Sequence, residues 1–180
     1  WRVSDGPILR NSVYLGEVYD ARREQPGWDK AGFDDSRWES AARAGEPELG
    51  PLCAQDAPPI RVTRTLKPVK LTEPKPSVFI FDFGQNFSGW ARLRVKGEAG
   101  TRVRLRSGEL LYPDGTLNGM TAVCGQIKGG GKDYRYDGVG QPKTAFQLDE
   151  YVLKGQGTEM FTSRFTFHGF RYVEVTGFPG

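Results

Sequence analysis

The stretch FDFGQNFSGW, from Phe81 to Trp90, gathers residue types from which binding sites are built. An apolar strand pattern is followed directly by Gly84, Gln85 and Asn86. Glycine allows a tight backbone turn, and side-chain amides offer both hydrogen-bond donors and acceptors. Loops between packed strands commonly carry binding groups. We therefore expect a core strand as far as Phe83, and after it a polar turn that belongs to a binding site.

Sequence signatures of catalysis are incomplete in this chain. GGGKD (129–133) lacks the spacing of a phosphate-binding loop, and QNFSG has Asn86 where a nucleophile elbow needs glycine. DGTLNG (114–119) lacks the ligand spacing of an EF-hand. A Ser/His/Asp triad would need His168, which lies among aromatic residues and is better explained as a packed, hydrogen-bonded imidazole. A pair of glycosidase carboxylates stays open, because sequence spacing does not give their separation.

The composition is that of a folded globular protein, with 37% hydrophobic and 26% charged residues. A net charge of +3 is too small to indicate a nucleic-acid partner, and no apolar run reaches the roughly 18–20 residues of a membrane span. Cys53 and Cys124 are expected to be buried free thiols, and a single disulfide between them is the alternative. With only one histidine, the two thiols make no zinc-type spacing.

Period-two alternation predicts β-strands along most of the chain. In WARLRVKGEAGTRVRLRSGEL (90–110), two alternating runs flank the Gly97–Gly100 turn, which predicts a hairpin with one apolar face. Its outward residues would then share one exposed face, and they are Arg92, Arg94, Arg102, Arg104 and Arg106. Another strand is expected in AFQLDEYVL (145–153), which ends at the turn of Gly155 to Gly157.

Two further patterns and a long loop complete the expected organisation. Phe165 and Phe167, then Val173 and Val175, predict a second alternating pair around His168-Gly169. SRWESAARA (36–44) predicts a short helix with Ser36 as its N-cap. The glycine-rich residues 120–143 predict a long loop. Together these patterns predict one domain over residues 1–180, an all-β antiparallel sandwich with long loops and little helix.

The chain resembles a known family through segments spread along its length. These segments are YLGEVYDARRE, GWDKAGFDDSRW, AQDAPPIRV, FDFGQNFSGW, SGELLYPDG and DEYVLKGQGTEMFTSRFTFHGFRYVEVTG. In this order they resemble the non-catalytic N-terminal β-sandwich region of bacterial α-L-rhamnosidases. The resemblance implies a jelly-roll fold of the galactose-binding-like type, cut from a larger multidomain glycosidase with a separate catalytic (α/α) barrel.

The resemblance also implies a role. The parent enzyme would hydrolyse terminal α-L-rhamnosyl groups of plant glycosides or pectic side chains, with an extracellular or periplasmic location favoured. The region itself would bind L-rhamnose as a carbohydrate-binding module, with neither nucleic acid nor membrane as a partner. One alternative is a purely structural support for the catalytic barrel of the same chain. A second alternative is a self-contained glycosidase that uses a carboxylate pair.

In some members of the family, a sandwich of this type binds L-rhamnose through a calcium ion, which takes six to eight oxygen ligands. By motif position, the resemblance places the metal ligands at Asp34, Asp35 and Asn86. The alternative is that Asp35 caps the turn at Ser36 and that Asn86 bonds its own backbone. The expected sugar-binding residues are Glu17, Trp28, Arg61, Gln85 and Trp90. The two tryptophans suit stacking on a deoxy sugar and suit a core position equally well.

Overall fold

The computed structural model describes residues 1–42, 45, 51–122 and 146–179. The chain falls into two compact units, which are described separately. The smaller unit comprises Trp1–Gly6 and Gln25–Thr65, and the larger unit comprises Pro7–Glu24 and Leu66–Gly180. That residues 1–180 form a single domain stays a prediction.

The smaller unit contains one short pair of strands. β1 (Arg2–Val3) pairs antiparallel with β4 (Glu39–Ser40). The helix predicted from Ser36 is therefore wrong, because residues 36–38 form a turn and the next two residues join β4. The physical cause is local: the Asp34 side chain accepts a hydrogen bond from the Ser36 backbone N–H at 3.0 Å. Such a side-chain turn competes with the backbone bonds of a helix.

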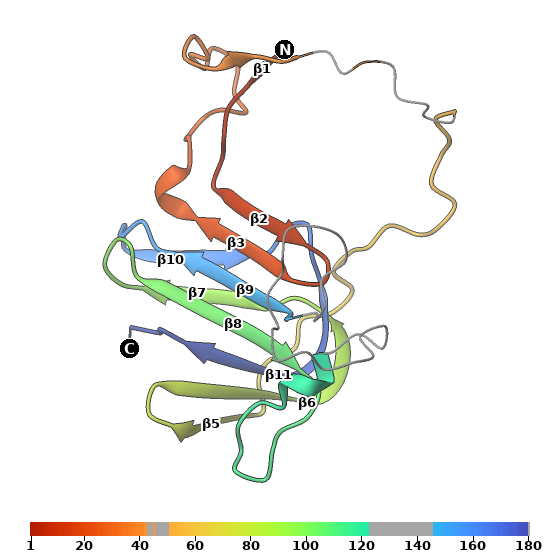
Figure 1. Ribbon diagram of the computed structural model, residues 1–180, viewed down its shortest axis with the longest axis vertical. Helices are drawn as coiled ribbons and strands as arrows, with labels where there is room; N and C mark the ends of the chain where they lie inside the picture. Colours follow the sequence, from red (N-terminus) through yellow and green to blue (C-terminus); the bar gives the residue numbers. More distant parts are fainter. Residues whose placement is uncertain (43–44, 46–50, 123–145, 180) are drawn as a thin grey trace. The chain divides into compact units, whose positions relative to one another are not determined.

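Among the described residues of the larger unit, nearly all regular elements are strands (Figure 1). They are β2 (Ile8–Ser12), β3 (Gly16–Asp20), β5 (Lys70–Lys75), β6 (Val78–Gly89), β7 (Arg92–Lys96), β8 (Arg102–Gly108), β9 (Leu148–Val152), β10 (Thr158–Thr162) and β11 (His168–Thr176). Among the described residues the helical elements are two short 3-10 turns, η1 (Ala21–Arg23) and η2 (Gly119–Ala122).

These strands form two layers. The larger sheet has the order β2-β3-β9-β8-β11-β6-β5, and β7 pairs with β10 in a second layer behind it (Figure 1). All pairs are antiparallel except β3 with β9, which is parallel. The core between the layers includes Val103, Leu105, Tyr151, Phe170, Val173, Leu93, Val95 and Phe161. The expected all-β sandwich with little helix is confirmed.

The predicted hairpin of β7 and β8 is wrong. β7 pairs with β10, whereas β8 pairs with β9 and β11, so the turn after Lys96 crosses from one layer to the other. The apolar sides of both strands are buried in the shared core, as the alternation predicted. Periodicity identifies the buried side of a strand but not its pairing partner. The five outward arginines consequently lie on the outer faces of two different sheets.

The strand predicted around Phe165 and Phe167 is also wrong. These residues lie between β10 and β11, with Phe165 67% and Phe167 37% exposed. Ser163 and Thr166 are buried instead, at 5% exposure each. The polar groups of this segment bond to buried oxygens elsewhere in the sandwich, and that requirement turns the phenylalanines outward. The strands expected in residues 145–153 and at Val173 are confirmed as β9 and β11.

Three remaining expectations concern loops and thiols. Cys53 is an exposed free thiol, so its expected burial is wrong; it lies in a segment with no strand to pack against. Cys124, and the long loop after η2, lie outside the described residues. No helix among the described residues is long and apolar enough to cross a membrane.

Gly16 provides a test of how closely β3 and β9 approach. Its φ is +92°, and a Cβ there would lie 2.2 Å from the Leu148 carbonyl oxygen. Gly157 also has a positive φ, +71°, but a Cβ there meets nothing within 4 Å. We expect Gly157→Ala to cost about 1–2 kcal/mol, the backbone term alone. Gly16→Ala should lower the free energy of unfolding clearly more, measured by urea denaturation. Equal losses would contradict the close approach.

Candidate functional site

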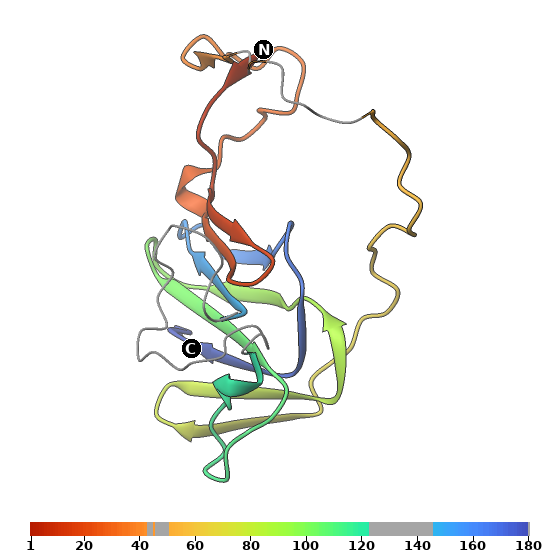
Figure 2. The same ribbon diagram turned by 45° about the vertical axis from the view of Figure 1, so that its right-hand side comes forward.

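A bulge in β6 presents the polar residues singled out by the sequence. Phe87 pairs with Phe170 and Asp82 with Tyr172, so residues 83–86 of β6 stand opposite Arg171 alone. Gly84 permits this bulge with a φ of +77°. The strand does not end at Phe83 as expected, because pairing with β11 resumes beyond the bulge. After the bulge, β6 stays paired with β11 through Phe87, Ser88 and Gly89 and leads into β7 (Figure 2).

An ion pair holds the bulge in place. Arg171 donates to both carboxylate oxygens of Asp82, from Nε at 2.8 Å and from Nη2 at 2.9 Å. The Gly84 N–H donates to Asp82 Oδ1 at 2.7 Å. The hydrogen bonds from Arg171 lower the pKa of Asp82 despite the partial burial of its carboxylate. Sequence reasoning missed this pair, whose members are 89 residues apart.

Gln85 and Asn86 are exposed at the bulge. Neither side chain makes a hydrogen bond with any residue that the structure describes, so both amides face outward with their bonding capacity available. Trp90 follows the end of β6 and is partly buried. The bulge therefore offers oxygen and nitrogen ligands on a backbone that is fixed by the Asp82–Arg171 pair.

The other predicted ligands lie in the smaller unit. Trp28 is 62% exposed, and Arg61 is exposed as well. The hydrogen bond from Ser36 to Asp34 lowers the pKa of the Asp34 carboxyl. The turn at Ser36 is thus capped by Asp34, and the expected alternative of a cap by Asp35 is wrong. The Asp35 carboxylate is exposed, and its backbone oxygen accepts from the Trp38 N–H at 2.9 Å.

The predicted calcium ligands are divided between the units. Asp34 and Asp35 are neighbours in the smaller unit, and Asn86 belongs to the larger unit. Their carboxylate and amide oxygens are the donor type that calcium prefers, so their chemistry fits the ion. Within the described residues, no three side chains from His, Cys, Asp and Glu are grouped to hold a metal. Calcium at these residues stays a prediction.

Glu17 lies in a different environment from the other predicted sugar ligands. Its side chain is fully buried, and Oε2 accepts from Asn11 Nδ2 at 3.0 Å and from the Arg164 N–H at 3.1 Å. Its carboxylate bonds the interior of the chain. Glu17 is therefore not part of the proposed sugar site.

Asp149 forms the second half of this buried network. Asp149 Oδ1 accepts from the Glu17 backbone N–H at 2.9 Å, and Oδ2 lies 3.1 Å from His168 Nε2. Ser163 Oγ donates to Asp149 Oδ2 at 3.3 Å. His168 is 2% exposed, so the prediction of a packed, hydrogen-bonded imidazole is confirmed. These acids and this histidine connect strands, and they are sealed from solvent.

Two family models match the chain. Residues 72–180 match the bacterial alpha-L-rhamnosidase concanavalin-like domain, and residues 1–64 match the alpha-L-rhamnosidase N-terminal domain. Among curated relatives, an alpha-L-rhamnosidase of Streptomyces avermitilis is 47% identical over 180 residues, covering 100% of this chain and 16% of the relative. One from Formosa agariphila is 33% identical and covers 98% of this chain and 17% of the relative.

The solved structures that resemble the chain are also alpha-L-rhamnosidases. The alpha-L-rhamnosidase of Dictyoglumus thermophilum superimposes with a TM-score of 0.83 at 44% identity, covering 100% of this chain and 18% of that one. The Streptomyces avermitilis enzyme, solved in complex with L-rhamnose, superimposes with a TM-score of 0.83 at 47% identity and covers 100% and 16%. The chain thus spans less than a fifth of the length of these relatives. The family resemblance inferred from the sequence is confirmed.

The ion pair at the bulge predicts a pH dependence of stability. Because Arg171 lowers the folded-state pKa of Asp82, the carboxylate stabilises the fold fully above its unfolded pKa of about 3.9. This contribution is lost as the pH falls through the lower, folded-state pKa. We expect the free-energy difference between wild type and Asp82→Asn, from urea unfolding, to be largest near neutral pH and to shrink below about pH 4.

Asp29→Asn provides the control, since Asp29 is exposed and has no hydrogen bond or ion pair with the residues that the structure describes. Its effect should be small throughout. A difference for Asp82→Asn that is constant between neutral and acid pH would contradict the ion pair.

Proposed function

Because the chain belongs to the bacterial alpha-L-rhamnosidase family, we propose that it is a non-catalytic, sugar-binding region of such an enzyme. Its ligand is a terminal L-rhamnosyl group, held with the help of a calcium ion. The observation that carries this proposal is the set of exposed oxygen ligands and the exposed Trp28, in a chain 47% identical to an enzyme solved with L-rhamnose.

The burial of Glu17 and Asp149 supports the proposal that this region is non-catalytic. A glycosidase needs two carboxyl groups that flank the scissile bond of a bound sugar. The buried carboxylates Glu17 and Asp149 are 0% and 3% exposed and are occupied by internal hydrogen bonds. In the proposed enzyme, hydrolysis belongs to the remaining length of the polypeptide, which in the relatives is more than four fifths of the chain.

The proposed binding chemistry uses side chains whose oxygen and nitrogen atoms are not all bonded to other described residues. The free Asp35 carboxylate, the second oxygen of Asp34 and the Asn86 amide oxygen supply hard ligands for calcium. A bound calcium ion would take sugar hydroxyls as further ligands. Trp28 offers an exposed ring for the apolar face of the deoxy sugar. Gln85, Trp90 and Arg61 remain the proposed hydrogen-bonding and packing neighbours.

A second candidate is a structural support for the catalytic domain of the same polypeptide. Large apolar side chains exposed on the larger unit favour it. Phe165 is 67% and Phe167 is 37% exposed. Exposed apolar side chains that gather in one patch are typical of surfaces that are covered in a larger assembly.

Titration calorimetry with L-rhamnose distinguishes the two candidates. We expect binding in calcium and its loss in excess chelator. Asn86→Ala and Asp35→Ala should each weaken binding at least about tenfold, a change of 1.4 kcal/mol. Their combined effect should be less than additive, because losing either ligand already disrupts the same ion site.

Circular dichroism should show an unchanged fold, because both residues are exposed. Asp29→Ala, which removes an exposed carboxylate of the same unit, should bind as wild type does. Equal affinity in calcium and in chelator would refute the metal site. No binding of L-rhamnose by the wild-type chain would favour the structural candidate.

A further inference from the structure

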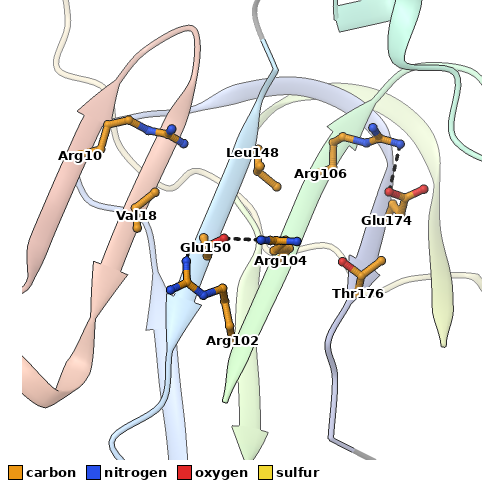
Figure 3. A pocket seen from close by; sticks show the side chains of 9 residues that line it. All are labelled: Arg10, Val18, Arg102, Arg104, Arg106, Leu148, Glu150, Glu174 and Thr176. Carbon is orange, nitrogen blue, oxygen red and sulfur yellow. Dashed lines mark hydrogen bonds and ion pairs between the residues drawn. The ribbon is translucent and has the colours of Figure 1, made fainter. Parts of the chain in front are cut away.

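The outer face of the larger sheet is hollowed into a groove of about 550 Å³ (Figure 3). Its charged lining comes from four strands: Arg10 from β2, Arg102, Arg104 and Arg106 from β8, Glu150 from β9 and Glu174 from β11. We call this surface the arginine groove. It lies wholly within the larger unit and on the side of the sheet that faces away from the core.

The two carboxylates of the groove are already paired. Glu150 accepts from Arg102 and, at 2.9 Å, from Arg104 Nε, while Glu174 Oε1 lies 3.0 Å from Arg106 Nη2. Arg10 has no ion-pair partner among the described residues. Four guanidinium groups against two carboxylates leave the groove with two positive charges in excess. The groove therefore carries a net positive charge, which favours the binding of anions.

The paired arginines keep much of their bonding capacity. Each guanidinium carries five N–H donors, and each ion pair uses only part of them. The side chains of Arg102 and Arg104 remain 52% and 55% exposed. The Glu150 side chain, in contrast, is 7% exposed, and it holds the side chains of Arg102 and Arg104 through its ion pairs. This arrangement fixes the arginines in place at little further entropic cost to a partner that binds them.

The spacing fits a row of anions rather than one small ion. Arg102, Arg104 and Arg106 alternate along β8, so neighbouring side chains are about 7 Å apart. Arg10 belongs to β2, which is three strands from β8 in the sheet, so it lies about 14 Å across the sheet from the arginines of β8. None of the described lining residues is aromatic, so the groove has no platform for stacking bases or sugar rings. Carboxylates on a folded protein surface match both the spacing and the forked geometry of arginine.

We propose that the arginine groove docks an acidic surface of a neighbouring domain of the same, longer polypeptide. Two observations select this partner: the excess positive charge, and the relatives, in which this region is 16–18% of the chain. The proposal rests on the chain being part of a larger enzyme and is independent of rhamnose binding. Interfaces between domains of one chain are commonly polar, which suits an ion-paired face.

Arginine footprinting with phenylglyoxal tests this proposal in the full-length polypeptide. We expect Arg10, Arg102 and Arg104 to react several-fold more slowly there than in the isolated 180-residue chain. Arg92 and Arg94, on the outer face of the other sheet, are the internal control and should react equally in both. Adding about 1 M NaCl, where the screening length falls to about 3 Å, should restore the reactivity of the groove in the full-length protein.

A matched pair of charge reversals completes the test. R10E/R104E in the full-length polypeptide should expose Arg102 to the reagent, whereas R92E/R94E should leave the groove protected. Equal reactivity of the groove arginines in the full-length and isolated proteins would overturn the proposal, as would protection that salt does not relieve. If the groove is open in both proteins and added polygalacturonate protects it, its partner is an acidic polysaccharide and the proposal is wrong. The salt comparison uses only the full-length protein, so it decides even if the isolated chain does not fold.

Discussion

The larger unit depends on one buried carboxylate, that of Asp149. It accepts the Glu17 N–H of β3, lies within hydrogen-bond distance of His168 at the start of β11, and itself belongs to β9. A buried polar group left without a partner costs about 1–3 kcal/mol, so loss of any one of these bonds would destabilise the larger unit. This connection lies beside the parallel pairing of β3 with β9 and beside the close approach of Gly16 to Leu148.

The same network determines what the surface presents. The Glu17 carboxylate accepts backbone N–H groups of Arg164 and Phe165, and Thr166 Oγ1 donates to the Ser12 carbonyl. The segment between β10 and β11 therefore turns its polar groups inward and its phenylalanines outward. A second constraint, the partly buried Asp82–Arg171 ion pair, holds the bulge in β6. The exposed amides of the proposed site thus lie on a backbone that the Asp82–Arg171 pair holds in place.

The sequence predicted which sides of the strands are buried but not how the strands pair. Alternation correctly placed Leu93 and Val95, and likewise Val103 and Leu105, on the core side. It could not show that the two strands lie in different layers, because a half-buried strand has the same pattern in either position.

The partners Glu17 and Asp149 are 132 residues apart in sequence, so no local sequence pattern could predict their contact. The alternating phenylalanines at 165 and 167 resembled a strand because the buried carboxylate that turns them outward is invisible in the local sequence. The family, in contrast, was identified correctly from segments that cover most of the chain.

A crystal structure of this chain grown with calcium and L-rhamnose tests the central claim most directly, since it locates the sugar and the ion together. The account predicts one calcium ion bound by oxygens of Asp34, Asp35 and Asn86, with rhamnose hydroxyls among its ligands and the sugar ring against Trp28. A structure in which neither calcium nor rhamnose contacts these residues, at saturating concentrations of both, would contradict the account.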